Sequence, residues 1–113
     1  MFTRKTLTSH IDGFLADIKA AGYSPTRAVL FGSYANGNPH EHSDIDLAVW
    51  DNKFTGCGTV DVVPIASIIG RYPLLELHPF NSDDLDNPFA QEIIKKGKLV
   101  YLSPQPFLNQ SAQ

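Results

Sequence analysis

Residues 27–50 read RAVLFGSYANGNPHEHSDIDLAVW, and this stretch decides the fold. The apolar run RAVLF predicts a buried strand over 27–31, and the alternating pattern DIDLAVW predicts a half-buried strand over 44–50. Between the two strands, GSYANG at 32–37 is typical of a turn or of one short helical turn. The polar segment at 38–42 contains a proline and predicts a loop. A strand, a small-residue turn and a second strand that begins with two acids therefore follow one another closely.

The two acids of the second strand, Asp44 and Asp46, are candidate metal ligands. Successive side chains of a strand point to opposite faces, so these two carboxylates are expected to point the same way. Two carboxylates side by side repel each other unless a cation lies between them. Oxygen ligands suit Mg²⁺, which proteins commonly bind together with substrate phosphates. The pair therefore predicts a Mg²⁺ site that receives a nucleotide triphosphate.

The turn before this strand is a candidate phosphate site. Gly32 allows a close approach that a side chain would block, and Ser33 offers its hydroxyl and its backbone N–H to a phosphate oxygen. Gly37 and Ser43 complete the segment that leads to the two acids, and we assign all four residues to nucleotide binding. The pattern is not a P-loop, because no lysine follows the glycines. A Gly-Ser pair alone is usually just a turn, but the acids that follow it favour the functional interpretation.

Two-metal chemistry needs a third oxygen ligand, and the sequence offers two candidates. Asp61 lies in the apolar segment TVDVV, and Glu76 lies between two leucines of a third strand predicted over 72–80. If the second and third strands are parallel, a crossover of a dozen or more residues must separate them. Glu76 leaves room for a helical crossover and Asp61 does not, so we choose Glu76. His78 is expected to lie on the same face of the strand as Glu76. It is a hydrogen-bond partner of the metal ligands, a substrate contact or simply a half-exposed histidine.

The remaining segments predict helices around a small sheet. Apolar residues at helical spacing predict a helix over 6–21, and a shorter helix is expected over 61–69. Asn87-Pro88 opens a final helix that ends before Gly97, and a last strand is expected over 98–102. The buried side of the final helix is expected to consist of Phe89, Ile93 and Ile94.

Length and composition limit the class of protein. The 113 residues, 42% of them hydrophobic, suffice for one small core. A net charge of −3 and a pI of about 5.7 lack the basic stripe of a nucleic-acid binder. One cysteine, Cys57, suits a reducing cytoplasm, and no apolar run reaches the about 18 residues that span a bilayer. We therefore expect a cytoplasmic domain over 1–102 with a tail over 103–113, and neither membrane nor direct nucleic-acid binding.

These motifs resemble those of the DNA polymerase β-type nucleotidyltransferase superfamily. Its signature is Gly-Ser, a short spacer with a glycine, Asp-x-Asp, and a third carboxylate on a later strand; here these are GSYANG, SDIDL and LEL. The sequence is most similar to the minimal nucleotidyltransferases, small proteins encoded beside HEPN-domain partners, over about residues 5–102. The resemblance implies an α/β (α+β) class and a small nucleotidyltransferase fold, a mixed β-sheet of about four strands with helices packed on it.

The resemblance also implies roles for individual residues. Gly32 and Ser33 would hold the triphosphate of ATP, and Asp44 and Asp46 would bind one or two Mg²⁺ ions. Glu76 would help to activate the acceptor hydroxyl, at a position where the family commonly has aspartate. A second departure is the asparagine before the last glycine of the turn, where arginine or lysine is common.

An activity and a partner follow from the same resemblance. We expect transfer of a nucleoside monophosphate, AMP from ATP, onto a hydroxyl of a HEPN-domain toxin, so that this AMPylation neutralises the toxin and the chain acts as its antitoxin. A chain this small is expected to complete its substrate surface with a partner, as a hetero-oligomer. The alternative is a non-catalytic antitoxin or binding module that neutralises its partner by covering it. Transfer to a small molecule such as an aminoglycoside is a third hypothesis, disfavoured by the missing second domain.

Overall fold

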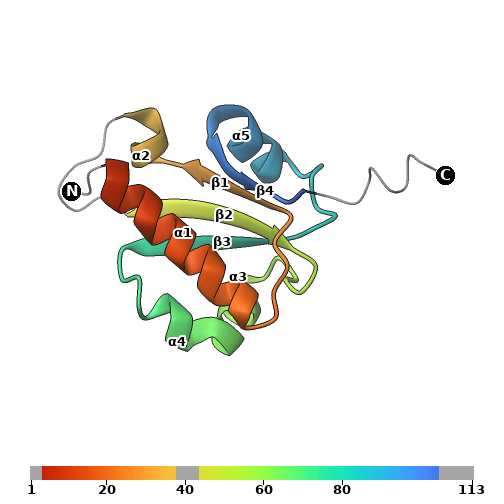
Figure 1. The fold of residues 1–113 in the computed structure, drawn as a ribbon. Helices are drawn as coiled ribbons and strands as arrows, with labels where there is room; N and C mark the ends of the chain where they lie inside the picture. The colour runs from red at the N-terminus through yellow and green to blue at the C-terminus, as the bar shows by residue number, and fades with distance from the viewer. Residues whose placement is uncertain (1–3, 38–43, 105–113) are drawn as a thin grey trace.

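The computed structural model describes residues 4–37 and 44–104, which fold into helices around a mixed sheet (Figure 1). Within these residues the sheet has four strands in the order β3-β2-β1-β4. β1 is antiparallel to both β2 and β4, whereas β2 and β3 run parallel. This confirms the expected fold class. The strands are β1 (Arg27–Phe31), β2 (Ile45–Asp51), β3 (Leu75–Asn81) and β4 (Lys98–Leu102).

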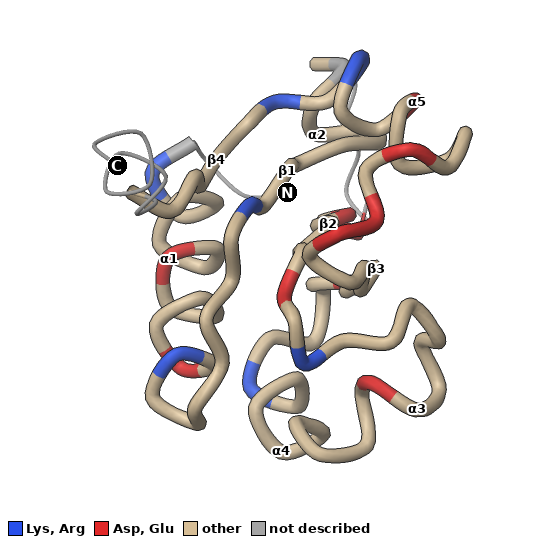
Figure 2. Tube along the Cα trace, turned by 90° about the vertical axis from the view of Figure 1, so that its right-hand side faces the viewer, with Lys and Arg blue, Asp and Glu red and all other residues tan. Residues whose placement is uncertain are grey.

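Helices cover both faces of this sheet, and Figures 1 and 2 show α1 and α5 on opposite sides of the strands. The parallel strands β2 and β3 are joined by a crossover of three short helical segments. Among the described residues, none of the helices has the length and apolarity that a membrane crossing requires. The helical segments are α1 (Arg4–Ala20), α2 (Ser33–Asn36), α3 (Gly58–Val62), the 3-10 turn η1 (Val63–Ile65), α4 (Ala66–Ile69) and α5 (Pro88–Lys96).

The larger core lies between the sheet and the layer formed by α1, η1 and α4. Helix α1 ends at Ala20, one residue before the predicted end, and Gly22 follows it with a φ of +102° that few other residues tolerate. The Tyr72 hydroxyl donates a hydrogen bond of 2.8 Å to Asp17 of α1. Burial and this aspartate raise the pKa of Tyr72. The α1 residues in this core are Ile11, Phe14, Leu15 and Ile18, and its strand residues are Ala28, Leu30, Ile45, Leu47, Val49 and Leu75.

The second face of β2 is buried as well, so the prediction of a half-buried strand is wrong. Ala48 and Trp50, both 0% exposed, form a second core with Phe80 and Ile93. Trp50 stacks on Phe80 with ring centroids 4.7 Å apart, and its indole N–H donates to the Asp84 carbonyl at 2.8 Å. The alternation of β2 could not reveal this cover, because α5 comes much later in the sequence.

Helix α5 begins as predicted but does not bury Phe89. The Asn87 side chain accepts the Ala90 N–H at 2.8 Å, which is a helix N-cap, and Pro88 takes the first helical position. Ile93 is 2% exposed, whereas Phe89 is 53% exposed. The Phe89 ring lies 6.3 Å from the Phe31 ring instead of entering the core. The first turn of α5 therefore presents an aromatic side chain at the surface.

The other predicted segments differ little from the structure or lie outside it. The helical crossover begins at Gly58, earlier than predicted, and the 3-10 turn that contains Pro64 interrupts it. The predicted loop over 38–42 and Ser43 lie outside the described residues, as does the tail beyond residue 104.

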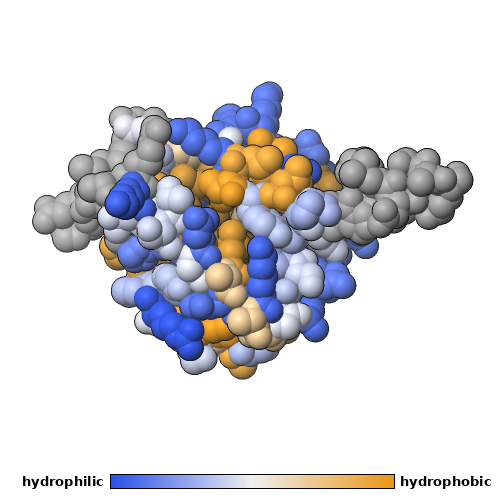
Figure 3. Space-filling view, in the orientation of Figure 1, coloured by the Kyte–Doolittle hydropathy of each residue, from blue (hydrophilic) through white to orange (hydrophobic). Residues whose placement is uncertain are grey.

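Figure 3 shows apolar side chains on the α1 side of the molecule. The exposed large apolar residues of the edge strand β4 are Leu99, Val100 and Leu102.

Candidate active site

The candidate site lies on the sheet face that α5 covers, where neighbouring strands place polar side chains side by side. The antiparallel register pairs Phe31 of β1 with Asp46 of β2. The parallel register pairs Asp46 with Glu76 of β3, and places His78 one row further, beside Ala48. Residues paired in register point to the same face of a sheet. Asp46 and Glu76 therefore meet because β2 and β3 are parallel, which is the geometry on which the choice of Glu76 depended.

Three of these side chains converge. Asp46, Glu76 and His78 each offer a ligand atom, and these atoms lie within 4.8 Å of one another. His78 Nε2 is 3.4 Å from Asp46 Oδ1 and 3.9 Å from Glu76 Oε2. The side chains of Asp46 and His78 are about one-quarter exposed, and that of Glu76 is 55% exposed. Two carboxylates and an imidazole at this spacing have the donor atoms that a divalent cation needs.

Asp44 occupies a different position from the other acids assigned to the metal. It immediately precedes β2 and is exposed. Within the part of the chain that the structure describes, its carboxylate does not belong to the group formed by Asp46, Glu76 and His78. The structure thus brings together two of the three predicted acids and adds a histidine. Asp44 remains a predicted ligand.

Gly32 lies directly against the Asp46 carboxylate. An ideal Cβ on Gly32 would be 2.2 Å from Asp46 Oδ2 and 3.1 Å from its Cγ, so any side chain would collide with this acid. Its φ of +76° also falls in the region that L-residues rarely adopt. Sequence reasoning assigned Gly32 to phosphate binding. The structure adds that glycine at this position makes room for the Asp46 carboxylate.

The other residues assigned to the nucleotide surround α2, which follows Gly32. Ser33 is the first residue of α2 and is half-buried. The helix ends at Asn36, and the N–H of its C-cap residue Gly37 donates to the Ser33 carbonyl. Tyr34 is 8% exposed and belongs to the larger core, so it supports the turn from beneath. Ser43 lies outside the described residues, and its assignment to the nucleotide stays a prediction.

Asp61, the rejected candidate for the third acid, is buried and holds a loop. It is 4% exposed. One carboxylate oxygen accepts the Thr55 N–H at 2.9 Å and the Thr55 hydroxyl at 3.0 Å, and the other accepts the Gly56 N–H at 2.9 Å. A carboxylate with these partners stabilises the loop after β2 and is not presented to a substrate.

Replacing Asp61 by alanine is expected to lower the free energy of unfolding by about 2–3 kcal/mol, because the N–H groups of Thr55 and Gly56 lose a charged partner. Urea denaturation measures this loss. The exposed Asp12 is the matched control, and Asp12→Ala is expected to change stability by less than about 0.5 kcal/mol. Metal affinity should be unaffected in both variants. A folded Asp61→Ala protein that no longer binds metal would show that Asp61 belongs to the metal site.

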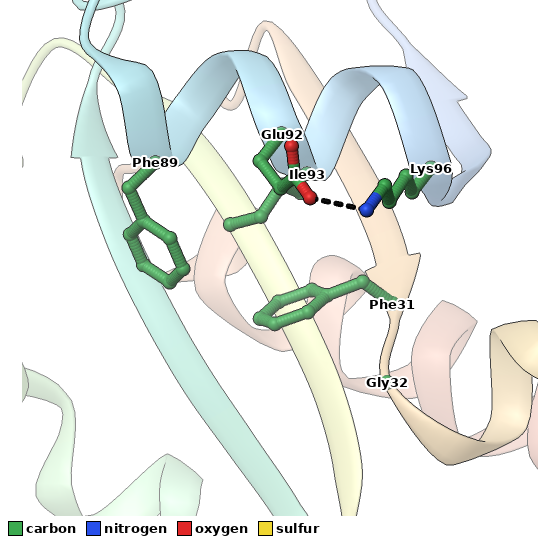
Figure 4. Close-up of a pocket in the computed structure, with 6 residues that line it drawn as sticks. All are labelled: Phe31, Gly32, Phe89, Glu92, Ile93 and Lys96. Atoms are coloured by element: carbon green, nitrogen blue, oxygen red, sulfur yellow. Dashed lines mark ion pairs between the residues drawn. The ribbon is translucent and has the colours of Figure 1, made fainter.

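A small apolar pocket adjoins Gly32. Figure 4 shows Phe31 and Phe89 facing this pocket, and Glu92 forming an ion pair with Lys96 along α5. The pocket has a volume of about 160 Å³, and its lining includes Gly32. Its apolar wall and its position beside the glycine turn make it a candidate surface for part of a substrate.

A second pocket also has Phe89 in its wall. It has a volume of about 250 Å³, and its lining includes Glu76 and His78. Phe89 lines both pockets. Of the converging group, Glu76 and His78 line the second pocket, whereas the first pocket adjoins Gly32.

Comparison with known proteins agrees with this geometry. Residues 17–105 match the family described as Polymerase beta, Nucleotidyltransferase. A search of curated proteins gave no significant match. A crystal structure of a toxin–antitoxin with AMP-PNP is similar at a TM-score of 0.61 and 20% identity, covering 93% of this chain and 81% of that chain. A double Asp-to-Glu mutant of the toxin–antitoxin MntA–HpeT is similar at a TM-score of 0.58 and 18% identity, with the same coverage.

The solved structures and the family match support different conclusions about this chain. At 18–20% identity, the likeness to the two solved structures shows the fold. The family match is more informative, because it extends over most of the chain and includes β1, β2 and β3, the strands that carry the candidate site. The chain belongs to the polymerase beta-type nucleotidyltransferase family.

Proposed function

We propose that this chain is a Mg²⁺-dependent nucleotidyltransferase that moves AMP from ATP onto a hydroxyl group of a partner protein. The observation that carries the proposal is the convergence of Asp46 and Glu76 from parallel strands, beside Gly32, in a member of this family. The similar structure with AMP-PNP supports ATP as the nucleotide, since AMP-PNP is an ATP analogue. Both similar structures are toxin–antitoxin proteins, which supports a protein partner.

The residues of the site fit a metal–nucleotide complex. Asp44 and Asp46 are the proposed ligands of the ion that accompanies the triphosphate, and Glu76 is the proposed ligand on the acceptor side. Ser33 and Gly32 would receive the phosphates, with Gly37 and Ser43 completing this binding segment. A bound Mg²⁺ would polarise the α-phosphate and stabilise the negative charge of the departing pyrophosphate.

In the proposed reaction the acceptor oxygen attacks the α-phosphorus of ATP. A new oxygen–phosphorus bond forms as the bond between the α-phosphorus and its bridging oxygen breaks, and pyrophosphate leaves with that oxygen. We place the acceptor hydroxyl in the second pocket, which Glu76 and His78 line, so that Glu76 accepts its proton. Asp46 lies against the glycine turn and 3.4 Å from His78, which lines this pocket, so it is placed to orient both reacting molecules.

The proposed partner is a HEPN-domain toxin, which AMP transfer would neutralise in the cytoplasm. The chain would then be an antitoxin that acts in a hetero-oligomer, with residues 1–102 as the catalytic domain and 103–113 as a tail. The exposed apolar side chains of edge strand β4 favour a protein partner, because such strands are usually covered or paired.

The direct test combines the purified chain, ATP labelled at the α-phosphate, Mg²⁺ and the protein encoded beside it. We expect the label to appear on the partner, with a mass increase of one AMP and with release of pyrophosphate. Omitting Mg²⁺ or adding a chelator should prevent labelling. If the partner is bound and neutralised without labelling, the chain is a binding module and the proposed transfer is wrong.

A second expected result is that Mg²⁺ and ATP together raise the melting temperature. A ligand that binds only the folded state at about ten times its Kd adds about 1.4 kcal/mol, which corresponds to about 5–8 °C for a domain of this size. Differential scanning fluorimetry measures the shift, with ATP plus chelator as the control. An unchanged melting temperature at millimolar Mg²⁺ and ATP would contradict an intact site.

A further inference from the structure

His78 is the member of the converging group to which the proposed reaction gives no role. Its Nε2 atom is buried and has no hydrogen-bond partner among the described residues. The nearest acceptor is Asp46 Oδ1 at 3.4 Å, which is longer than the about 2.7–3.2 Å of an N–H···O hydrogen bond. A buried polar atom without a partner costs about 1–3 kcal/mol, and in native proteins it usually has a ligand, an ion or water beside it.

Two aromatic contacts hold the His78 ring in place. Its centroid lies 4.8 Å from the Phe31 ring and 6.3 Å from the Phe89 ring, both in edge-to-face arrangements. Phe31 belongs to β1 and Phe89 to α5, so the imidazole is held from two elements. Nε2 is therefore kept beside the carboxylates of Asp46 and Glu76 by packing and does not need a hydrogen bond to stay there.

From these observations we infer that His78 is a direct metal ligand, and that Asp46, Glu76 and His78 together bind one divalent cation. The three donor atoms already lie within 4.8 Å of one another. A cation among them would partner the unsatisfied nitrogen and offset the repulsion between the two carboxylates. The inference rests on the proposed function, because it concerns the acceptor-side ion of the same reaction.

A nitrogen ligand changes which metal this position prefers. Mg²⁺ favours oxygen ligands and retains water, whereas imidazole binds first-row transition ions better, in the Irving–Williams order. The group formed by Asp46, Glu76 and His78 is therefore expected to bind Mn²⁺ more tightly than Mg²⁺. The nucleotide would still bring Mg²⁺ to Asp44 and Asp46. The nucleotide-side ion would then be Mg²⁺ and the acceptor-side ion Mn²⁺.

The experiment uses the full chain with Mn²⁺ alone, without nucleotide. Pulsed EPR of the Mn²⁺-loaded protein is expected to show the ¹⁴N coupling of a coordinated imidazole. In His78→Gln this coupling should disappear, and calorimetric titration should show Mn²⁺ affinity falling about tenfold or more while Mg²⁺ affinity changes less than about twofold. His10→Gln is the matched control, since His10 lies on α1 outside the group, and should retain both properties.

Three results would overturn the inference. The first is wild-type protein that does not bind millimolar Mn²⁺ or that binds it without ¹⁴N coupling. Neither of these measurements requires a variant to fold. The second is coupling that persists in His78→Gln. The third is an equal loss of Mn²⁺ and Mg²⁺ affinity in His78→Gln, which would make His78 a positioning residue for Asp46. None of these readouts depends on AMP transfer, so failure of the proposed function and failure of this inference are separately visible.

Discussion

Replacing Asp46 by asparagine is expected to slow AMP transfer by about 10³-fold while leaving the metal-free protein at least as stable as the wild type. Asp46 is the central acid of the converging group: it lies against Gly32, pairs in register with Glu76 and lies 3.4 Å from His78. Removing its charge weakens metal binding and the stabilisation of charge on the reacting phosphate. Asparagine keeps the shape of the side chain, so the packing around it should survive.

The stability gain has its own physical cause. Asp46 and Glu76 are cross-strand neighbours of like charge, which destabilises a sheet unless a cation lies between them. Neutralising one of them should therefore raise the metal-free free energy of unfolding by about 0.5–1 kcal/mol. It should also abolish the rise in melting temperature that Mg²⁺ and ATP produce. Urea denaturation without metal and fluorimetry with metal measure the two effects.

The matched control is Asp86→Asn, because Asp86 is an exposed acid on the loop before α5. It should change neither transfer nor the response to metal. A folded Asp46→Asn protein that transfers AMP at the wild-type rate would show that the converging group is not the catalytic centre.

The double variant Asp44→Asn and Asp46→Asn separates the enzyme from the binding module. If the chain acts by transfer, the variant should bind its partner normally and fail to neutralise it. If the chain acts by covering the partner, neutralisation should persist without either carboxylate. Partner binding measured by gel filtration ensures that a misfolded variant is not mistaken for a catalytic defect.

The part of the site that could be predicted from sequence followed from chain geometry. Asp46 and Glu76 are separated by enough residues for a crossover between parallel strands, and the structure pairs them in the register of β2 and β3. Asp61 is too close to Asp46 for that, and its buried carboxylate instead holds the loop at Thr55 and Gly56. Local spacing sufficed here because the length of a crossover limits which residues can meet.

Other features depend on tertiary contacts that no local pattern contains. The second buried face of β2 arises from α5, so the alternation that places Trp50 opposite Val49 could not show that both are covered. The exposure of Phe89 also depends on tertiary contacts. Phe89 shares the helical spacing of Ile93, but its ring lies near the sheet residues Phe31 and His78 instead of entering the core. The unpartnered Nε2 of His78 is visible only when these rings are in place.

Replacing Gly32 by alanine is expected to damage both the fold and the site. At φ +76° and ψ −151°, a region that is essentially restricted to glycine, an alanine costs about 2 kcal/mol in backbone strain alone. Its Cβ would also be 2.2 Å from Asp46 Oδ2, so the carboxylate must move away from Glu76 and His78. We expect the free energy of unfolding to fall by about 2–3 kcal/mol in total, and AMP transfer to fall by at least about 10²-fold, because misplacing a reacting group by about 1 Å can cost that much.

Gly22→Ala separates backbone strain from the collision with Asp46. Gly22 also has a positive φ, +102°, but an ideal Cβ there meets no atom within 4 Å. Its replacement should therefore cost only the backbone strain, about 1 kcal/mol, and leave metal binding and transfer unchanged. A loss of Mn²⁺ affinity in Gly32→Ala but not in Gly22→Ala, measured by Mn²⁺ titration, then reports the displacement of the Asp46 carboxylate. Equal effects of the two substitutions would mean that Gly32 serves only the turn, and that the position of Asp46 does not depend on it.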